Sequence, residues 1–340
     1  MRIVFHSNQI SERGTETAII DYAFANQQYL ENESIIAFPS NKIFNEERFL
    51  YIKENFKVIE YTKIDEFHDI LEREKVDLLY AIVDGESYPD LIDSLPLKRK
   101  YKTFVHAVFS TKRYHGDFYC PIHSFLNEFY HSNYPVLPHI VVPFKGTSET
   151  LRDELQIPQT AIVFGSYGGP NSFNIPFVQE CVREVAIKNK NIYFIFLNVV
   201  PFADKDIKNI IFLPGTTNLN YKEKFINTTD AMLHARSDGE TFGLGIGEFS
   251  IKNKPVITYS PPIKFRLKEV VRSYLGRRPI YSMAHIQNLK DKAICYHNQK
   301  ELYKILVNYS PIKGNFDCFS EKFSPETVIK TFNNILSGRG

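Results

Sequence analysis

The chain has 340 residues, 43% of them hydrophobic and 24% charged, which fits an ordinary globular protein and excludes a disordered or fibrous one. Its 41 basic and 39 acidic side chains leave a net charge of +2, so the chain as a whole shows no preference for nucleic acid. This length favours two domains with separate cores over one. The four cysteines lie far apart, without the spacing of a zinc site or a disulfide framework, and favour a reducing compartment.

A basic stretch lies in the second half of the chain. Residues 262–313 contain eleven Lys or Arg, but only Glu269, Asp291 and Glu301 as acids. Six of the cations are clustered: Lys264, Arg266, Lys268, Arg272, Arg277 and Arg278. The stretch is either a solvated face or a surface that attracts a phosphorylated or membrane-bound acceptor. Because there is no signal-peptide core or membrane-spanning run, we expect a cytoplasmic protein, or one held peripherally at a membrane by this region.

Short apolar runs alternate with helical patterning through the whole chain, as in α/β proteins with buried parallel strands. In the first half the predicted strands are Ile3–His6, Ile35–Phe38, Val58–Tyr61, Leu78–Val83, Thr103–Val108 and Ile140–Val142. In the second half they are Ile162–Gly165, Ile192–Leu197, Ile210–Leu213, Ala231–His234 and Val256–Tyr259. The alternation restarts after residues 145–158, so we place the domains at 1–150 and 151–322.

The last segment, FSPETVIKTFNNIL, carries a helix start signal. Ser324 is placed as the N-cap and Pro325 at the first helical position, while Val328, Phe332 and Ile335 share one face. Residues 323–340 are therefore predicted to form a terminal amphipathic helix, which we expect to cross back to the N-terminal domain.

The most informative stretch is TTDAMLHARSDGETFGLGIGEFSIKNKPVITYS, residues 228–260. It reads as a strand, a polar loop, a glycine-rich turn, a helix beginning near Phe242 and a second strand opened by Pro255. Glycines let the backbone approach a ligand closely, and the free amides of a helix start attract an anion such as a phosphate. Glu240 and Glu248 flank the turn with seven residues between them, a separation that suits a ligand with two distinct polar ends.

GETFGLGIGEF followed by NKPVIT resembles the donor-site signature of the large retaining glycosyltransferase family of GT-B fold (glycosyl transferases group 1). In that family a Glu, seven residues and a second Glu precede a similar Lys-Pro-Val-Ile strand. The N-terminal MRIVFHSNQISERGTETAIIDYAF also resembles the family's opening strand and glycine loop. The similarity covers the chain in outline and is specific at residues 209–258. It implies two Rossmann-like domains facing across a cleft, with the nucleotide-sugar donor in the C-terminal one.

Carried over by residue, the resemblance implies that Glu248 holds the ribose hydroxyls and that Glu240 faces the transferred sugar. The resemblance also implies three further sets of donor-binding residues. Thr241, Phe242, Gly243 and Leu244 lie at the turn, and Pro214, Gly215 and Leu219 contact the base of the nucleotide. The third set is Gly168, Gly169 and Asn171. Gly14 and Thr15 mark the loop where the acceptor is expected. His106 ends an apolar strand; it is either a ligand of the donor sugar or a hydrogen-bonded core histidine.

The sequence departs from the family at the diphosphate. Most members carry Gly-Arg and then Lys-Gly after the first strand of the C-terminal domain, but here no basic residue lies between Ile162 and Val178. Arg236 is the first candidate for the missing cation and Lys145 the second. If neither stabilises the leaving group, the protein binds a sugar nucleotide without transferring it efficiently.

We therefore expect a retaining, metal-independent glycosyltransferase acting on a glycan, lipid-linked or other acceptor, with no cofactor. A nicotinamide-dependent dehydrogenase would need three spaced glycines after its first strand, whereas SNQISERGTE has one. A sugar-nucleotide epimerase and a non-catalytic binding subunit remain as alternatives, because fold alone does not secure activity.

Overall fold

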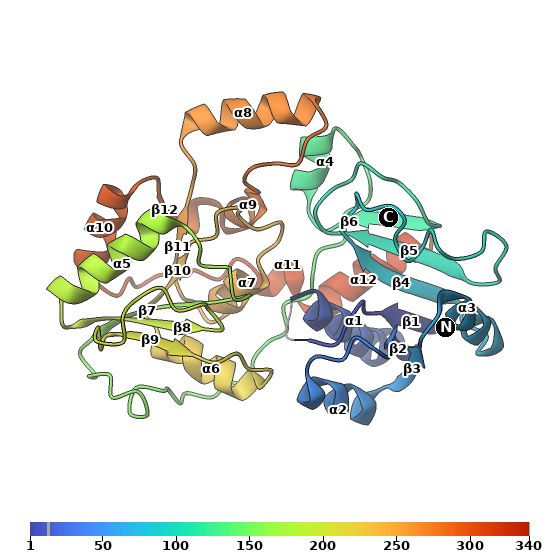
Figure 1. Ribbon diagram of the computed structural model, residues 1–340, viewed down its shortest axis with the longest axis horizontal. Coiled ribbons are helices and arrows are strands. Elements are labelled where there is room, and N and C mark those ends of the chain that lie inside the picture. Colours follow the sequence, from blue (N-terminus) through green and yellow to red (C-terminus); the bar gives the residue numbers. More distant parts are fainter. Residues whose placement is uncertain (12–13, 340) are drawn as a thin grey trace. The chain divides into compact units, whose positions relative to one another are not determined.

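The computed structural model describes residues 1–11 and 14–339 and divides into two compact units. The first unit comprises Met1–Val142, Arg272–Arg278 and Lys322–Gly340, and the second comprises Pro143–Val271 and Pro279–Glu321. The chain thus leaves the first unit at Val142, a few residues before the boundary at residue 150 expected from the sequence. Each unit is built on its own parallel sheet, with helices packed beside it (Figure 1).

The sheet of the first unit has the strand order β3-β2-β1-β4-β5-β6. Its strands are β1 (Arg2–His6), β2 (Glu33–Pro39), β3 (Lys57–Tyr61), β4 (Leu78–Val83), β5 (Lys102–Ala107) and β6 (Phe118–Pro121). The helices of this part of the chain are α1 (Gly14–Leu30), α2 (Glu46–Asn55), α3 (Ile64–Arg73) and α4 (Ser124–Tyr130). All its strand pairs are parallel, which requires a crossover connection after each strand.

The second unit repeats this topology, with the order β12-β11-β10-β7-β8-β9. Its strands are β7 (Ile162–Tyr167), β8 (Ile192–Leu197), β9 (Ile210–Leu213), β10 (Ala231–His234), β11 (Val256–Tyr259) and β12 (Ala293–Tyr296). The helices that follow along the chain are α5 (Pro176–Lys188), α6 (Leu219–Thr228), α7 (Leu244–Ile251), α8 (Ile263–Tyr274), α9 (Ala284–Leu289), a 3₁₀ turn (Lys290–Lys292) and α10 (Gln299–Val307). Counted within its own unit, each sheet has the doubly wound order 3-2-1-4-5-6 of a Rossmann fold.

Most predicted strands are confirmed, because continuous apolar runs mark strands buried on both faces. Leu78–Val83, Ile192–Leu197, Ile210–Leu213, Ala231–His234 and Val256–Tyr259 coincide with strands of the structure.

The predicted strand Ile140–Val142 is wrong. Ile140 and Val141 are buried, but the described backbone contact of this segment is a single hydrogen bond from Val141 N to Phe323 O, at 2.8 Å. Pro138 and Pro143 bracket it, and proline has no N–H with which to continue a ladder. Two short strands, β6 and β12, fill the outer positions of the sheets instead.

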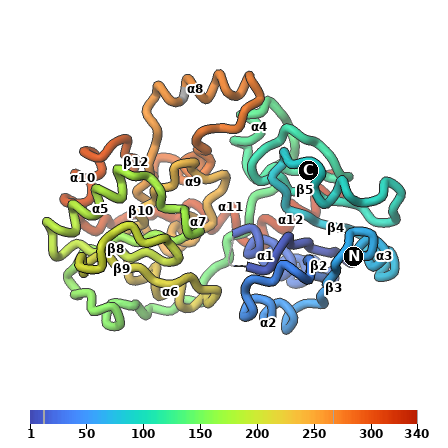
Figure 2. Tube along the Cα trace, in the orientation of Figure 1, coloured from blue at the N-terminus to red at the C-terminus, as the bar shows by residue number. Residues whose placement is uncertain are grey.

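The chain ends by returning to the first unit, as predicted, through α11 (Ser320–Phe323) and α12 (Pro325–Leu336) (Figure 2). The Ser324 side chain caps α12 by accepting a hydrogen bond from Thr327 N, and Pro325 occupies the first turn. The apolar face of α12 packs beside α1. Its centre is Phe332, which is fully buried with its ring 5.0 Å from that of Phe104, between centroids.

We predict that Phe332→Ala destabilises the first unit by about 3–5 kcal/mol, because truncating a buried aromatic ring leaves a cavity beside Tyr22, Tyr80 and Phe104. Urea unfolding followed by circular dichroism measures the loss. Lys330→Ala, on the exposed face of the same helix, is the control and should change stability by less than about 0.5 kcal/mol. Equal losses in the two variants would show that α12 is not packed through Phe332.

Candidate functional site

The centre of the second sheet is the point where its strand order reverses. β7 and β10 are parallel neighbours there, but the chain continues from β7 to β8 on one side and from β10 to β11 on the other. The loops that follow these strands diverge, and open α/β sheets bind ligands outside the carboxyl ends of strands at such a point. Here the loops are joined by Asn174, whose Oδ1 accepts from Ser237 N at 2.7 Å and whose N–H donates to Ala235 O at 3.0 Å.

The turn after β10 is fixed to Ser282. Gly239 has a φ of +65°, and a Cβ at this position would lie 2.1 Å from Ser282 O. The next residue completes the attachment, because Glu240 N donates to Ser282 O at 3.2 Å and Ser282 Oγ donates to Glu240 O at 2.9 Å. Only glycine combines this backbone conformation with so close an approach. The backbone of Glu240 is therefore held in one position at the sheet edge.

Helix α7 begins directly after this turn. Gly243 is its N-cap, with a left-handed φ of +87°, and the helix starts at Leu244, two residues after the position predicted from the sequence. The N–H of Gly247 donates to Gly243 O at 2.9 Å. The amides of the preceding helical residues have no carbonyl of α7 to bind, so they and the helix dipole favour an anion at this end.

Glu240 lies between two basic side chains. Arg236 Nη1 donates to its Oε2 at 3.0 Å, and His234 Nε2 lies 3.7 Å from its Oε1. Burial alone would raise the pKa of this carboxyl, but the interaction with His234 and the charge of Arg236 outweigh that effect and lower the pKa to about 2. Glu240 is therefore an anion throughout the physiological pH range.

Behind Glu240, a buried chain of hydrogen bonds fixes the ring of His234. His234 Nδ1 lies 2.8 Å from Thr258 Oγ1, which in turn lies 3.1 Å from His285 Nε2. Burial lowers the pKa of His285 to about 3, so this ring is neutral. Since a carboxylate oxygen only accepts hydrogen bonds, His234 makes a favourable contact with Glu240 only when Nε2 carries a proton. Sequence reasoning missed both histidines, because they are far apart in the chain and carry no ligand spacing.

Glu248 has a different environment, on the second turn of α7. Lys222 of α6 forms an ion pair with it at 2.8 Å, and the same ammonium lies 5.0 Å from the centre of the Tyr167 ring. Both charged side chains of the pair are largely buried. The two glutamates thus stand at the two ends of the turn with separate cationic partners. Lys222 was also missed, because a lysine on an amphipathic helix is ordinarily a solvated residue.

The two cations proposed from the sequence to bind the diphosphate, Arg236 and Lys145, have different environments in the structure. Arg236 reaches the site but is engaged with Glu240. Lys145 is exposed and precedes Gly146, whose N–H donates to Glu223 on α6 at 3.1 Å.

The remaining predicted donor residues lie on three segments at the carboxyl edge of the second sheet. The loop after β7 carries Gly168, Gly169 and Asn171, the loop after β9 and the start of α6 carry Pro214, Gly215 and Leu219, and the turn carries Thr241, Phe242, Gly243 and Leu244. The Phe242 side chain is buried, with its ring 5.9 Å from that of Phe319, so only its backbone is presented to a ligand.

Of the two interpretations given for His106, in the first unit, the structure favours a hydrogen-bonded core histidine. It is fully buried on β5, and its Nε2 donates to Leu137 O at 2.7 Å while its Nδ1 accepts from the Tyr80 hydroxyl. Burial lowers its pKa to about 4, against a smaller opposing effect of the Leu137 carbonyl. Both ring nitrogens are thus engaged within the protein, which leaves no atom for a sugar hydroxyl.

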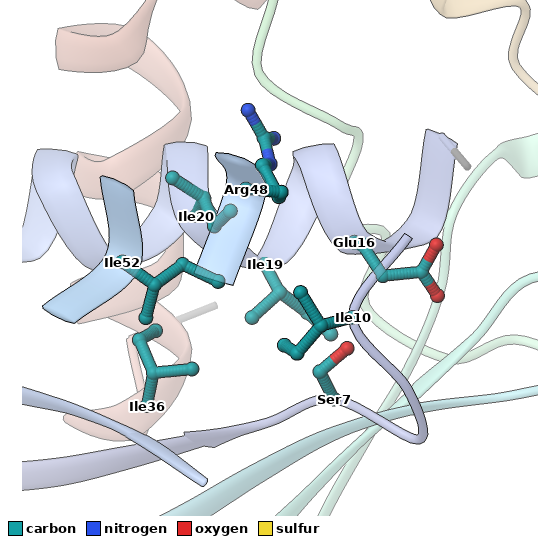
Figure 3. Close-up of a pocket in the computed structure, with 8 residues that line it drawn as sticks. All are labelled: Ser7, Ile10, Glu16, Ile19, Ile20, Ile36, Arg48 and Ile52. Carbon is teal, nitrogen blue, oxygen red and sulfur yellow. The ribbon is translucent and has the colours of Figure 1, made fainter. Parts of the chain in front are cut away.

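Gly14 and Thr15 are the first two residues of α1, and the next residue, Glu16, lines a small pocket of the first unit (Figure 3). Thr15 Oγ1 donates to Glu16 at 3.1 Å. Residues 12 and 13, which precede Gly14 in the sequence, lie outside the described residues. The pocket is lined by Ser7, Ile10, Glu16, Ile19, Ile20, Ile36, Arg48 and Ile52. Its lining is chiefly buried isoleucine, with the charged ends of Glu16 and Arg48 at its margins.

Among residues 1–11 and 14–339, one group of side chains has its ligand atoms close enough to hold a metal ion, namely Asp90, Asp93 and His115. The two carboxylates already have basic side chains as partners. His115 Nε2 lies 2.7 Å from Asp90, and Arg113 forms ion pairs with both carboxylates. The chain also contains an Asp-x-Asp triplet, Asp204 to Asp206, in an exposed loop before β9 and outside this group.

We predict that Gly239→Ala destabilises the second unit, because alanine is strained at this φ and its Cβ would clash with Ser282 O. Gly169→Ala is the matched control. A Cβ at Gly169 meets nothing within 4 Å, so its stability should change by less than about 0.5 kcal/mol. Thermal unfolding of the two variants makes the comparison, and similar melting temperatures would contradict the proposed attachment to Ser282.

We predict a pH-dependent loss of stability in Glu240→Gln. The folded-state pKa of Glu240, about 2, lies below the ordinary value of 4.5, so its stabilisation is complete above pH 4.5 and is lost as the pH falls toward 2. The variant should therefore be less stable than the parent by up to about 3 kcal/mol at pH 7, and by less at pH 3.

Urea unfolding across this pH range measures the difference. Glu184→Gln, at a surface pair with Lys188, should show little difference at any pH. A Glu240→Gln deficit that stays constant down to pH 3 would contradict the assigned ionisation.

No protein-family model and no curated protein matches the sequence. The structure, however, is similar to solved structures over nearly its whole length. HepE from Anabaena, in complex with UDP and glucose, has a TM-score of 0.70 at 12% identity, with 99% of each chain covered. A glycosyltransferase from Rickettsia africae has a TM-score of 0.60 at 11% identity, covering 99% of this chain and 93% of its own.

A putative UDP-N-acetylglucosamine 2-epimerase from Listeria monocytogenes has a TM-score of 0.57 at 10% identity, covering 99% of this chain and 96% of its own. At these identities the likeness concerns the fold. Two six-stranded parallel sheets with Rossmann strand order, matched along almost the whole chain, show that this protein has the GT-B fold.

Proposed function

We propose that the protein is a glycosyltransferase that moves a sugar from a nucleotide-sugar donor to a glycan, lipid-linked or other acceptor, with retention and without a metal. The observation that carries this proposal is the turn between β10 and α7. It presents two carboxylates, Glu240 and Glu248, at the two ends of an amide-rich helix start, at the switch point of a doubly wound sheet. A nucleoside diphosphate sugar has this same order of polar groups, because the hydroxyls of its ribose and of its sugar lie on either side of the diphosphate.

In this arrangement the diphosphate lies against the amides at the start of α7 and beside Gly168 and Gly169. Glu248 accepts hydrogen bonds from the ribose diol, and the loop from Pro214 to Leu219 contacts the base. Glu240 faces the sugar. Because it stays ionised, it accepts hydrogen bonds from sugar hydroxyls and stabilises positive charge that develops at the anomeric carbon.

The cations that the loop after β7 lacks are supplied by two other elements, Lys222 from α6 and Arg236 from the β10 loop. Each is now paired with a glutamate of the turn. Phosphate oxygens are strong acceptors for both side chains, so we propose that donor binding draws them from the carboxylates to the diphosphate. As the diphosphate leaves with growing negative charge, the same two cations stabilise it, in the role that a metal plays in other transferases.

The acceptor is assigned to the first unit, near Gly14 and Thr15. His106 is given no contact with substrate, because its two ring nitrogens bind Leu137 and Tyr80.

An isomerase that acts on a sugar nucleotide is the second candidate, favoured by the contact between Glu240 and His234. A carboxylate and an imidazole 3.7 Å apart are two groups that can exchange protons with a bound sugar. The two candidates differ in their products, because an isomerase converts the donor without an acceptor and a transferase releases a nucleoside diphosphate.

We predict that Glu248→Gln weakens the binding of a nucleoside diphosphate and of its sugar conjugate alike, by about 10–100-fold, because each loses a charge-assisted hydrogen bond to the ribose. Titration calorimetry with UDP, GDP, ADP and TDP and their sugars measures this effect, with Glu184→Gln as the control. Lys222→Met and Arg236→Met should reduce turnover more than affinity, because charge on the leaving phosphate grows toward the transition state.

Excess EDTA should leave turnover unchanged. A chain that binds none of these nucleotides would contradict the proposal, as would turnover that is lost on chelation and restored by magnesium or manganese. Conversion of the donor without acceptor or nucleotide release would establish the isomerase instead.

A further inference from the structure

Helix α8 carries its apolar stripe on the outside. Ile263, Leu267, Val270, Val271 and Tyr274 follow the spacing i, i+4, i+7, i+8 and i+11, which places them on one face of a helix. In an ordinary globular protein such a face is buried in the core. Here all five side chains are between 54% and 77% exposed, and Leu275, the next residue, is 61% exposed.

The opposite face of α8 attaches the helix to the protein. Glu269 accepts a hydrogen bond from Tyr281 N at 2.8 Å, and Arg272 Nε donates to Arg278 O at 2.8 Å. Ser273 Oγ donates to Phe129 O at 2.6 Å. The polar side of the helix therefore makes these hydrogen bonds, while its apolar side chains are exposed. Tyr274, at the end of the stripe, also has its ring 4.9 Å from that of His131. A contiguous apolar surface of this kind marks an interaction site.

Exposed cations flank the stripe. Lys264 and Lys268 follow Ile263 and Leu267 by one residue, which places them about 100° further round the helix. Arg277 is exposed just beyond the helix. The side chain of Arg266 lies outside the described part of the chain. Glu269 is the only acidic residue of the sequence between positions 262 and 278, and it is used internally.

We propose that α8 is a membrane-interface helix that docks on a bilayer surface rich in anionic lipids, with its apolar stripe among the upper acyl chains and its lysines at the headgroups. Apolar side chains beside basic ones are the pattern of helices that lie in the plane of an interface. The twelve residues of α8 extend about 18 Å, less than the ~30 Å of a bilayer core. None of the described helices is long and apolar enough to cross a membrane.

The charges favour a lipid surface over a second copy of the chain. A symmetric pair of α8 helices would bring the lysines of one copy close to those of the other, whereas anionic headgroups neutralise them. The proposal is independent of the proposed transferase activity, since membrane docking is measured without a substrate. The proposal also assigns the membrane contact expected of the basic residues 262–313 to one helix, α8.

The sequence contains no tryptophan, so a single introduced tryptophan reports its own surroundings. Leu267→Trp should show a blue-shifted emission when vesicles of phosphatidylglycerol and phosphatidylcholine are added, and no shift with phosphatidylcholine alone. Leu97→Trp is the matched control, at a leucine of the first unit that is 97% exposed. It should not shift with either vesicle.

Co-sedimentation with the same vesicles measures affinity. Leu267→Glu should weaken partitioning by about tenfold or more, because it removes an inserted apolar side chain. Lys264→Gln with Lys268→Gln should weaken it by about 25-fold, at about fivefold for each charge lost, and added salt should act in the same direction. Leu97→Glu should bind like the parent. Circular dichroism checks folding, and the tryptophan and lysine variants carry the test if Leu267→Glu unfolds.

Three results would overturn the proposal. The first is the absence of sedimentation with anionic vesicles, and the second is an equal emission shift at positions 267 and 97. The third is a change of oligomeric mass in light scattering on Leu267→Glu with vesicle binding unaltered, which would assign the stripe to a second copy of this chain.

Discussion

The parallel pairing of β7 with β10 is the constraint on which the candidate site depends. These strands are joined through Phe164 and Ala231 in the middle of the second sheet, although α5, β8, β9 and α6 lie between them in the chain. The connections from the two strands run to opposite sides of the sheet, so their loops diverge. A crevice is therefore expected at the carboxyl ends of the two strands. This pairing fixes the positions of three segments: the glycine loop after β7, the turn after β10 and the start of α7.

Paired charges dominate the environment of that edge. Lys222 with Glu248 and Arg236 with Glu240 place two cations and two anions around the helix start, in surroundings less polar than water. Removing one member of such a pair leaves the other uncompensated, which makes each pair strongly coupled. In the proposed function, a diphosphate is an alternative partner for the two cations and releases the two carboxylates to hydroxyl groups.

Two structural devices make Glu240 a fixed rather than a mobile group. Its backbone is hydrogen-bonded to Ser282, and its carboxylate lies 3.7 Å from His234, two contacts that do not depend on Arg236. A charge held in place in this way needs little rearrangement when a ligand binds, which is the condition under which electrostatic stabilisation is most effective. Helix α8 differs from an ordinary surface helix in the face by which it is attached. Its polar face provides its attachment, so its apolar face stays accessible to a partner outside the chain.

Much of the framework was readable from local pattern. Leu78–Val83 and Ile192–Leu197 were predicted to the residue, because a strand buried on both faces needs an unbroken apolar run. The cap at Ser324 and the turn at Gly239 were visible for a similar reason, since capping and positive φ select few residue types. Where an apolar run had no free N–H at its flanking prolines, as at Ile140–Val142, pattern alone misled.

Charge partners were decided only by the tertiary structure. The sequence located Glu240 and Glu248 through the turn between them, because both lie on one continuous segment. It could not pair Glu248 with Lys222, or connect His234 through Thr258 to His285, because these residues meet only after β10, β11, α6 and α9 have packed. Similarly, the stripe of Leu267 and Val271 is readable in any helical projection, but whether it faces the core or the solvent depends on which side of α8 the rest of the protein holds. Periodicity fixes which residues share a face, and long-range packing fixes where that face points.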